Sequence, residues 1–314
     1  MIDFIKIEIP FYSRAKLLEN RFLDFKSKYS LTTGELSESK IIAEYKGMKF
    51  ISLNSNRLII QGSIHKYFNF LQNKTAPNQY TAEKIAKGFN GNTFNNTQLK
   101  FAINNLCNTI EIKPNKAILR GFEYGLNITI KHKCNLFLNS LIQHKNLTFS
   151  SVKDINQFYR QAKHQRFIVK CYDKQIQYGL NKQTIRFENK QTKMIDLNNL
   201  PIVTLADLQK SKNLNLLLPL LLKKWDEVIL YDFTIKKKLL SKNQKEKNKD
   251  LSNPYFWQNT KANHTHRYKK RLKDYSIKFG SNVHQDFKIK MQEQWQKQNQ
   301  NCVTFNRLLK RATV

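Results

Sequence analysis

The sequence contains little glycine, proline or cysteine. It has 9 Gly and 6 Pro among 314 residues, which excludes collagen-like and Gly/Pro-rich filament architectures. The cysteines are widely separated, so the spacing indicates neither a disulfide framework nor a compact zinc site. We therefore expect reduced structural thiols in a cytoplasmic protein. The cysteines are Cys107, Cys134, Cys171 and Cys302.

Long apolar runs are also missing. The N-terminus alternates apolar and charged residues and does not contain the apolar region of a signal peptide. The most apolar stretch, residues 214–222, includes Asn215 and Pro219 and is too short to span a bilayer. These features predict a soluble protein that does not use a membrane as a partner.

Acidic residues are scarce relative to basic ones. There are 55 Lys and Arg against 23 Asp and Glu, giving a formal charge of +32, while 40% of residues are hydrophobic. The apolar fraction is sufficient for a folded core, and the excess charge predicts a polyanionic partner. Most of the cations are lysine, which favours contacts to a phosphate backbone over base recognition. A compositional bias toward Lys and Asn would explain the choice of lysine but not the shortage of acids.

The periodicity predicts an α+β fold. Alternating apolar residues predict strands over 5–9, 49–53, 57–61, 117–130, 166–174 and 184–190, with a hairpin turn at 54–56. Helices are expected over 15–29, 133–143 and 151–163, and another is expected to begin at Thr97. We expect an antiparallel-sheet catalytic domain backed by helices at residues 1–200. A helical, basic DNA-binding or accessory region should follow at 201–314, with a linker or basic arm at 236–249.

Three of the expected strands carry polar residues on the face opposite their apolar side chains. Carboxylate and amide oxygens on such a face suit Mg²⁺ or Mn²⁺, which can polarise a phosphoryl oxygen. Tyr172 could then attack phosphorus as a nucleophile, and Lys174 could lower its pKa or stabilise the phosphate charge. The same pattern also fits a packing tyrosine and surface ion pairs. The residues on this face are Glu123, Asn127, Lys170, Tyr172, Lys174, Arg186 and Glu188.

Four segments carry a resemblance to a known family. They are the opening residues 1–11, the stretch 61–67 (QGSIHKY), the stretch 122–128 (FEYGLNI), and the pair 169–174 (VKCYDK) with 185–188 (IRFE). In this order they resemble the replication initiator endonucleases of filamentous single-stranded DNA phages, of the phage X and phage replication protein CRI type. They also resemble related phage and plasmid rolling-circle initiation proteins. The resemblance covers roughly residues 1–235.

The resemblance implies site-specific nicking and joining of single-stranded DNA through a 5′-phosphotyrosine intermediate. It places the nucleophile at Tyr172, the lysine at Lys174 and a metal ligand at Glu188. Glu123 and Asn127 complete the expected Mg²⁺ or Mn²⁺ site, although the context of Glu123 departs from the family pattern by one spacer residue. The expected partners are single-stranded or supercoiled origin DNA, with a host helicase and a second copy of the chain as further candidates. The candidate DNA contacts are Lys170, Arg186, His65, Lys66 and Arg120.

Two alternatives remain open from the sequence. The first is a non-catalytic nucleic-acid-binding protein, such as a repressor or RNA-binding factor, which would tolerate a buried Tyr172. The second is a nuclease that uses water, in which Glu188 would matter and Tyr172 would not. Aromatic residues of the C-terminal region could stack on single-stranded bases or could anchor helices. They are Trp225, Trp257, Trp295, Tyr255, Phe256 and Tyr268.

Overall fold

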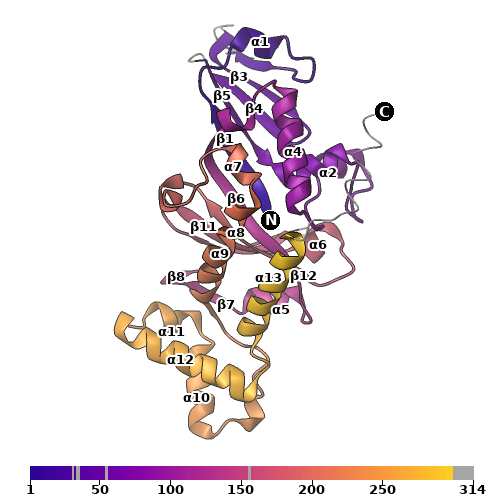
Figure 1. The fold of residues 1–314 in the computed structure, drawn as a ribbon. Coiled ribbons are helices and arrows are strands. Elements are labelled where there is room, and N and C mark those ends of the chain that lie inside the picture. The colour runs from indigo at the N-terminus through magenta and orange to yellow at the C-terminus, as the bar shows by residue number, and fades with distance from the viewer. Residues whose placement is uncertain (30–31, 33–35, 54–55, 155–156, 300–314) are drawn as a thin grey trace. The chain divides into compact units, whose positions relative to one another are not determined.

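The fold is α+β with a large antiparallel sheet, which confirms the expected class (Figure 1). The computed structural model describes residues 1–29, 32, 36–53, 56–154 and 157–299. Cys302 and most of the expected turn at 54–56 lie outside these residues. Ten strands form the large sheet in the order β2-β3-β4-β5-β1-β6-β12-β11-β10-β9. Contacts divide the chain into a first unit (1–124, 190–217 and 297 onward) and a second unit (125–189 and 218–296).

The first unit is built on an antiparallel arrangement around the N-terminal strand. Strand β1 pairs with β5 and β6, its isoleucines Ile5 and Ile7 are buried, and helix α2 packs against both β1 and α4. Asn95 begins α4 with a capping box that includes Gln98, so the expected start at Thr97 was two residues late. The elements are β1 (Ile2–Ile9), α1 (Arg14–Leu18), β2 (Lys26–Tyr29), β3 (Leu36–Tyr45), β4 (Met48–Leu53), β5 (Arg57–Ser63), α2 (Ile64–Leu71), α3 (Ala82–Ala86), α4 (Asn96–Thr109), η1 (Pro114–Lys116), β6 (Ile118–Thr129), η2 (Met194–Leu197), α7 (Leu205–Leu208) and α8 (Ser211–Asn215).

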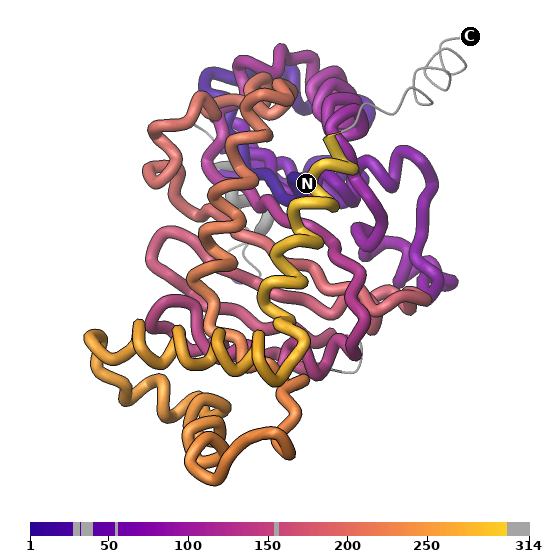
Figure 2. The backbone as a smooth tube through the Cα atoms, turned by 60° about the horizontal axis from the view of Figure 1, so that its bottom comes forward, coloured from indigo at the N-terminus to yellow at the C-terminus, as the bar shows by residue number. Residues whose placement is uncertain are grey.

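The second unit contains the remaining strands and a helical layer. Helices α9 and α13 lie next to each other, and the rings of Trp225 and Phe287 are 4.6 Å apart between centroids (Figure 2). Trp225 is fully buried, which confirms its expected anchoring role. The elements are α5 (Cys134–Asn139), β7 (Leu141–His144), β8 (Leu147–Thr148), β9 (Ser150–Asp154), β10 (Gln157–Lys163), β11 (Phe167–Asp173), α6 (Lys174–Tyr178), β12 (Thr184–Gln191), α9 (Leu217–Asp226), β13 (Val228–Leu230), η3 (Lys237–Leu239), α10 (Lys242–Leu251), α11 (Pro254–Gln258), α12 (Ala262–Phe279) and α13 (Val283–Asn299).

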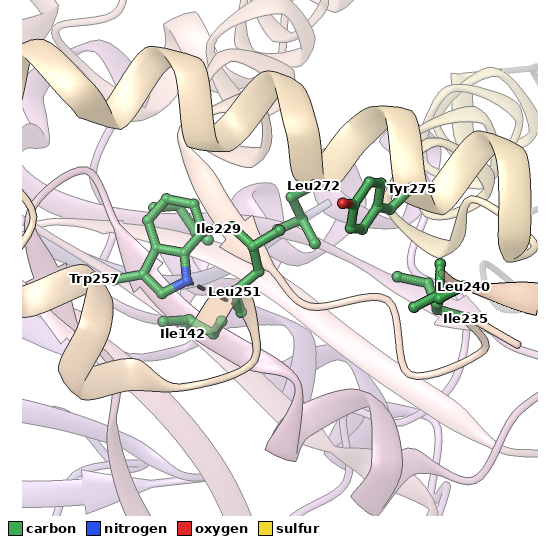
Figure 3. Packing of buried hydrophobic residues seen from close by; sticks show 8 residues of the cluster. All are labelled: Ile142, Ile229, Ile235, Leu240, Leu251, Trp257, Leu272 and Tyr275. Atoms are coloured by element: carbon green, nitrogen blue, oxygen red, sulfur yellow. Dashed lines mark hydrogen bonds between the residues drawn. The ribbon is translucent and has the colours of Figure 1, made fainter. Parts of the chain in front are cut away.

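A separate apolar cluster holds helices α10, α11 and α12 of the second unit. Trp257 lies in this cluster, and its indole Nε1 donates a hydrogen bond to the carbonyl oxygen of Leu251 at 2.9 Å (Figure 3). Leu272 and Tyr275 of α12 complete the packing from the opposite side. Because α10 covers residues 242–251, the expected linker or basic arm at 236–249 is wrong over most of its length.

One helix prediction was wrong, and two others were too long. Residues 151–163, expected to be one helix, form strands β9 and β10, which pair antiparallel. The expected helix over 133–143 ends early at Asn139 and gives way to β7, while that over 15–29 is limited to α1 and is followed by β2. Within the described residues, no helix has the length and apolar character needed to cross a membrane.

Candidate functional site

Tyr172 lies near the C-terminal end of β11, on the face away from the apolar side of the strand. Burial alternates along β11, with Val169 and Cys171 inaccessible and Lys170 and Tyr172 partly exposed. This is the alternation that the sequence predicts for a strand with one face on a core. Tyr172 pairs with Tyr159 of β10, and their ring centroids are 5.2 Å apart. The phenol is therefore oriented by a cross-strand aromatic contact and remains accessible to solvent.

Lys174 contacts Tyr172 but does not belong to the strand. Asp173 caps helix α6 by accepting a hydrogen bond from the amide of Ile176 at 2.9 Å, and Lys174 is the first helical residue. The Lys174 Nζ lies 5.1 Å from the Tyr172 ring centroid and donates to Gln177 Oε1 at 2.9 Å. Burial raises the pKa of the Asp173 carboxyl. The expected pairing of lysine and tyrosine is present, although it arises at a strand-to-helix junction.

Glu188 is a buried carboxylate on β12 with cationic neighbours. It is 1% exposed, and its carboxylate accepts a hydrogen bond from Arg186 Nε. Lys170 Nζ lies 3.7 Å from the same carboxylate and 5.7 Å from the Tyr172 ring centroid. Arg186 also donates to Asn127 Oδ1 of β6 at 3.1 Å. Lys170 thus contacts both the expected nucleophile and the expected metal ligand.

A glycine permits the close approach of β6 to β12 beside Glu188. A Cβ atom added at Gly125 would clash with the Cβ of Glu188 and with the carbonyl oxygen of Phe187. Two of the three nearest atoms belong to Glu188, and one of these is its backbone Cα. Rotation of a side chain could not relieve this overlap. Gly125 therefore lets β6 lie closer to β12 than a residue with a side chain at this position would allow.

Glu123 and Asp3 are two further buried acids on the strands of the large sheet. Lys190 Nζ lies 2.9 Å from a Glu123 carboxylate oxygen. Asp3 accepts hydrogen bonds from the Ser63 hydroxyl and from Asn90 Nδ2, the latter at 2.7 Å. Sequence reasoning missed Asp3. The available signal was an acid at a position that alternates with Ile5, Ile7 and Ile9, where the pattern of the strand predicts an apolar side chain.

Two of these acids lie together within the first unit. A carboxylate oxygen of Asp3 lies within 4.8 Å of one of Glu123, and both side chains are buried. The donor set consists of hard oxygens, which fits Mg²⁺ or Mn²⁺. Asn127, expected as a ligand, instead has its amide oxygen accepting a hydrogen bond from Arg186. Glu123 therefore lies next to a second acid, Asp3, while Glu188 lies in the second unit.

The remaining DNA-contact candidates lie in the first unit. His65 is on helix α2, is 2% exposed and stacks on Phe94, with its Nε2 2.8 Å from Asn92 Oδ1. Lys66 Nζ donates to the carbonyl oxygen of Lys87 at 2.6 Å, and burial lowers its pKa. Arg120 is exposed on β6.

Arg120 shares an acidic partner with a second arginine. Its Nε is 2.8 Å from Glu8, which Arg57 also contacts at 2.9 Å. Hydrogen bonds from Arg57 and Arg120 lower the pKa of the Glu8 carboxyl. The guanidinium groups of both arginines remain half exposed beside this shared acid.

The buried thiols fit the structural role expected for them. Cys107, Cys134 and Cys171 are buried and free, and burial raises the pKa of each thiol. A protonated thiol is a poor nucleophile and a poor metal ligand. Tyr172, and not one of these thiols, therefore remains the expected nucleophile.

Comparison with models of protein families, with curated proteins and with solved structures finds no match to the chain.

Proposed function

We propose that the protein is a metal-dependent DNA nicking and joining enzyme that initiates rolling-circle replication through a phosphotyrosine intermediate. One observation carries the proposal: Lys170 contacts both the partly exposed Tyr172 and the buried Glu188. A nucleophile next to a carboxylate and two lysines is the arrangement that attack on a phosphodiester requires. The charge of +32 supports a polyanionic substrate.

The reaction would proceed by direct displacement at phosphorus. Tyr172 Oη attacks, the Oη–P bond forms as the P–O3′ bond breaks, the phenol gives up its proton and the leaving 3′ oxygen takes one up. The tyrosyl phosphodiester conserves the energy of the cleaved bond, so a 3′-hydroxyl can reverse the attack and rejoin the strand. A nuclease that uses water could cut but could not rejoin.

The neighbouring cations would stabilise charge on the phosphate and on the phenolate. The Nζ atoms of Lys174 and of Lys170 both lie over the Tyr172 ring, at 5.1 and 5.7 Å from its centroid. A nearby positive charge favours the ionised phenol, which is the attacking species. Glu188, which Lys170 links to Tyr172 within the second unit, would be a ligand of a divalent ion, and that ion when bound would polarise a phosphoryl oxygen.

The experiment is a covalent-capture assay on wild type, Tyr172→Phe and Tyr178→Phe. The substrate is a randomised pool of single-stranded DNA labelled at its 3′ end, because a 5′-phosphotyrosine retains the fragment downstream of the cut. Tyr178 is a matched control, since its ring also lies near Lys174 Nζ, at 5.2 Å, but it is only 3% exposed. With Mn²⁺, wild type and Tyr178→Phe should form a labelled adduct that survives denaturing electrophoresis, and Tyr172→Phe should not.

Two results would overturn the proposal. An adduct that persists in Tyr172→Phe and is lost in Tyr178→Phe would assign the nucleophile to the neighbouring tyrosine. Cutting by all three proteins without any adduct would indicate a nuclease that uses water. Either result is distinguishable from misfolding because both changes remove a single oxygen and retain the aromatic ring.

A non-catalytic nucleic-acid-binding protein is the second candidate. The observation that favours it is the pairing of the acids with cations, Glu123 with Lys190 and Glu188 with Arg186. Such pairs can serve as structural ion pairs without a metal. Strong DNA binding by wild type with neither cutting nor adduct in the presence of Mn²⁺ would favour this candidate.

A further inference from the structure

One exposed and two partly buried aromatic side chains gather at a groove of the second unit, formed by residues of α10, α11, α12 and the segments joining them. The groove has a volume of about 620 Å³, and Tyr255, Phe256 and Tyr268 line it. Tyr255 is 69% exposed, although it is a large apolar ring on a short helix. A side chain of this kind is costly to expose and is typical of a surface that binds a planar or apolar ligand.

The groove is built on a rigid base. Trp257 follows Tyr255 by two residues, so the two side chains leave α11 on opposite sides, one into the core and one into solvent. Figure 3 shows Trp257 in the apolar cluster together with Ile142 and Leu272. Phe256 and Tyr268 pack against the same cluster, and their ring centroids are 4.9 Å apart. The aromatic lining is therefore held in place before a ligand arrives, which lowers the entropy cost of binding.

The surroundings of the groove are strongly basic. Helix α12 carries six Lys and Arg against one acid, Asp274. Arg267 and Arg271 lie with Cζ 5.3 and 5.8 Å from the Tyr268 ring centroid. Lys261 lines the groove directly, and Asp250 is the acidic residue in its lining. Cations next to open aromatic faces match a ligand that combines phosphate charge with planar bases.

We propose that this groove binds an unpaired nucleobase of single-stranded DNA, with Tyr255 as the stacking platform and the cations of α12 contacting the flanking phosphates. The choice of DNA over other polyanions rests on the proposed function, while the site lies outside the residues proposed for catalysis. Double-stranded DNA satisfies the cations but keeps its bases stacked internally. The groove therefore discriminates in favour of single strands.

The test is equilibrium binding of the full chain to an oligothymidylate of about 20 nucleotides, without divalent ions, using wild type, Tyr255→Ala, Tyr255→Trp and Tyr80→Ala. Loss of one base–aromatic stack should weaken binding of Tyr255→Ala by about 5- to 100-fold. Tyr255→Trp restores a π-face and should bind at least as well as wild type. Tyr80 is the matched control, because it is 74% exposed and has Lys84 Nζ 4.3 Å from its ring centroid.

A duplex of the same length completes the design. Tyr255→Ala should leave duplex affinity within about twofold of wild type, because the cations are unchanged. Single-strand binding by Tyr255→Ala equal to wild type would overturn the inference. Equal losses on single and double strands, or an equal loss in Tyr80→Ala, would overturn it too, since they indicate a general electrostatic or folding effect.

The outcome is separable from that of the proposed reaction, because the assay requires neither a metal nor Tyr172. A loss confined to Tyr255→Ala in a protein that forms no adduct would support the groove and contradict the nicking proposal. Adduct formation by wild type together with unchanged binding by Tyr255→Ala would support the nicking proposal and contradict the groove.

Discussion

Replacing Glu188 by Gln should destabilise the protein and remove its response to divalent ions. The change keeps the side-chain shape and one oxygen acceptor but removes the negative charge that Arg186, which is 2% exposed, contacts. At 3.7 Å, the separation of Lys170 and Glu188, a pair of unit charges interacts by about 4 kcal/mol at an effective dielectric constant of about 20. Lys170 can extend toward solvent, whereas Arg186 cannot. Breaking a buried pair costs about 3–5 kcal/mol. Because the variant keeps one oxygen acceptor, we expect the free energy of unfolding to fall by slightly less, about 2–4 kcal/mol.

Urea unfolding followed by far-UV circular dichroism, with EDTA present, measures this loss. Arg186→Met alone should be destabilising, because it removes the hydrogen-bonding cation of the Glu188 carboxylate and leaves only Lys170 at 3.7 Å. The double variant should be more stable than the sum of the two losses by about 2 kcal/mol, since neither charge is then left unpaired. If the losses add within about 0.5 kcal/mol, the two residues do not act as a buried pair and the electrostatic reasoning is refuted.

Three further predictions concern charge, protonation and close packing. Affinity for DNA should fall about 100-fold between 50 and 200 mM salt if about four phosphates are contacted; a change below threefold would contradict the polyanion argument. Burial lowers the pKa of His144 to about 3, against an ordinary value of 6.5. As the pH falls below about 6.5, this histidine takes up a proton in the unfolded protein but not in the folded one, so the free energy of unfolding decreases. The free energy of unfolding should decrease by up to about 1.4 kcal/mol per pH unit. The urea midpoint of His144→Gln should therefore change less between pH 7 and pH 4 than that of wild type. An equal change in both proteins would exclude this histidine as the cause. Gly125→Ala should lower the melting temperature far more than Gly280→Ala, where an added Cβ would meet its nearest atoms at 3.1 Å; equal shifts would show that β6 and β12 can separate easily.

The strands of the candidate site could be predicted because their apolar and polar residues alternate. The alternation of β11 predicts Tyr172 and Lys170 on the face away from Val169, as observed. Lys174 was expected two residues further along the same face, but Asp173 caps a helix and ends the strand. The contact with Tyr172 survives because a lysine side chain is long enough to reach back from the first helical turn.

Strands β9 and β10 could not be distinguished from a helix by periodicity. Phe158 and Ala162 are buried four residues apart, which is also helical spacing, and Arg160 occupies the position between them. In the structure Arg160 donates hydrogen bonds to the carbonyl oxygens of Leu138, Leu141 and Phe149. A charged residue that satisfies buried carbonyls looks like a solvent-facing residue in the sequence.

Asp3 could not be placed because a register shift determines its orientation. Strand β1 pairs with β6 as Ile2 with Tyr124 and Ile5 with Phe122, so the register changes by one residue between the two pairs. A bulge of this kind redirects side chains within a strand. Simple alternation puts Asp3 with the apolar isoleucines, and only the paired strand reveals the irregularity.

The most direct measurement of the central claim is the identity of the peptide that retains the nucleotide after proteolysis of the covalent adduct. Trypsin cleaves after Lys170, Lys174 and Lys182, so it separates residues 171–174, which contain Tyr172, from residues 175–182, which contain Tyr178. Mass spectrometry of the nuclease-trimmed adduct should find a 5′-phosphonucleotide on the 171–174 peptide. A nucleotide on the 175–182 peptide, or on any peptide without Tyr172, would contradict the account.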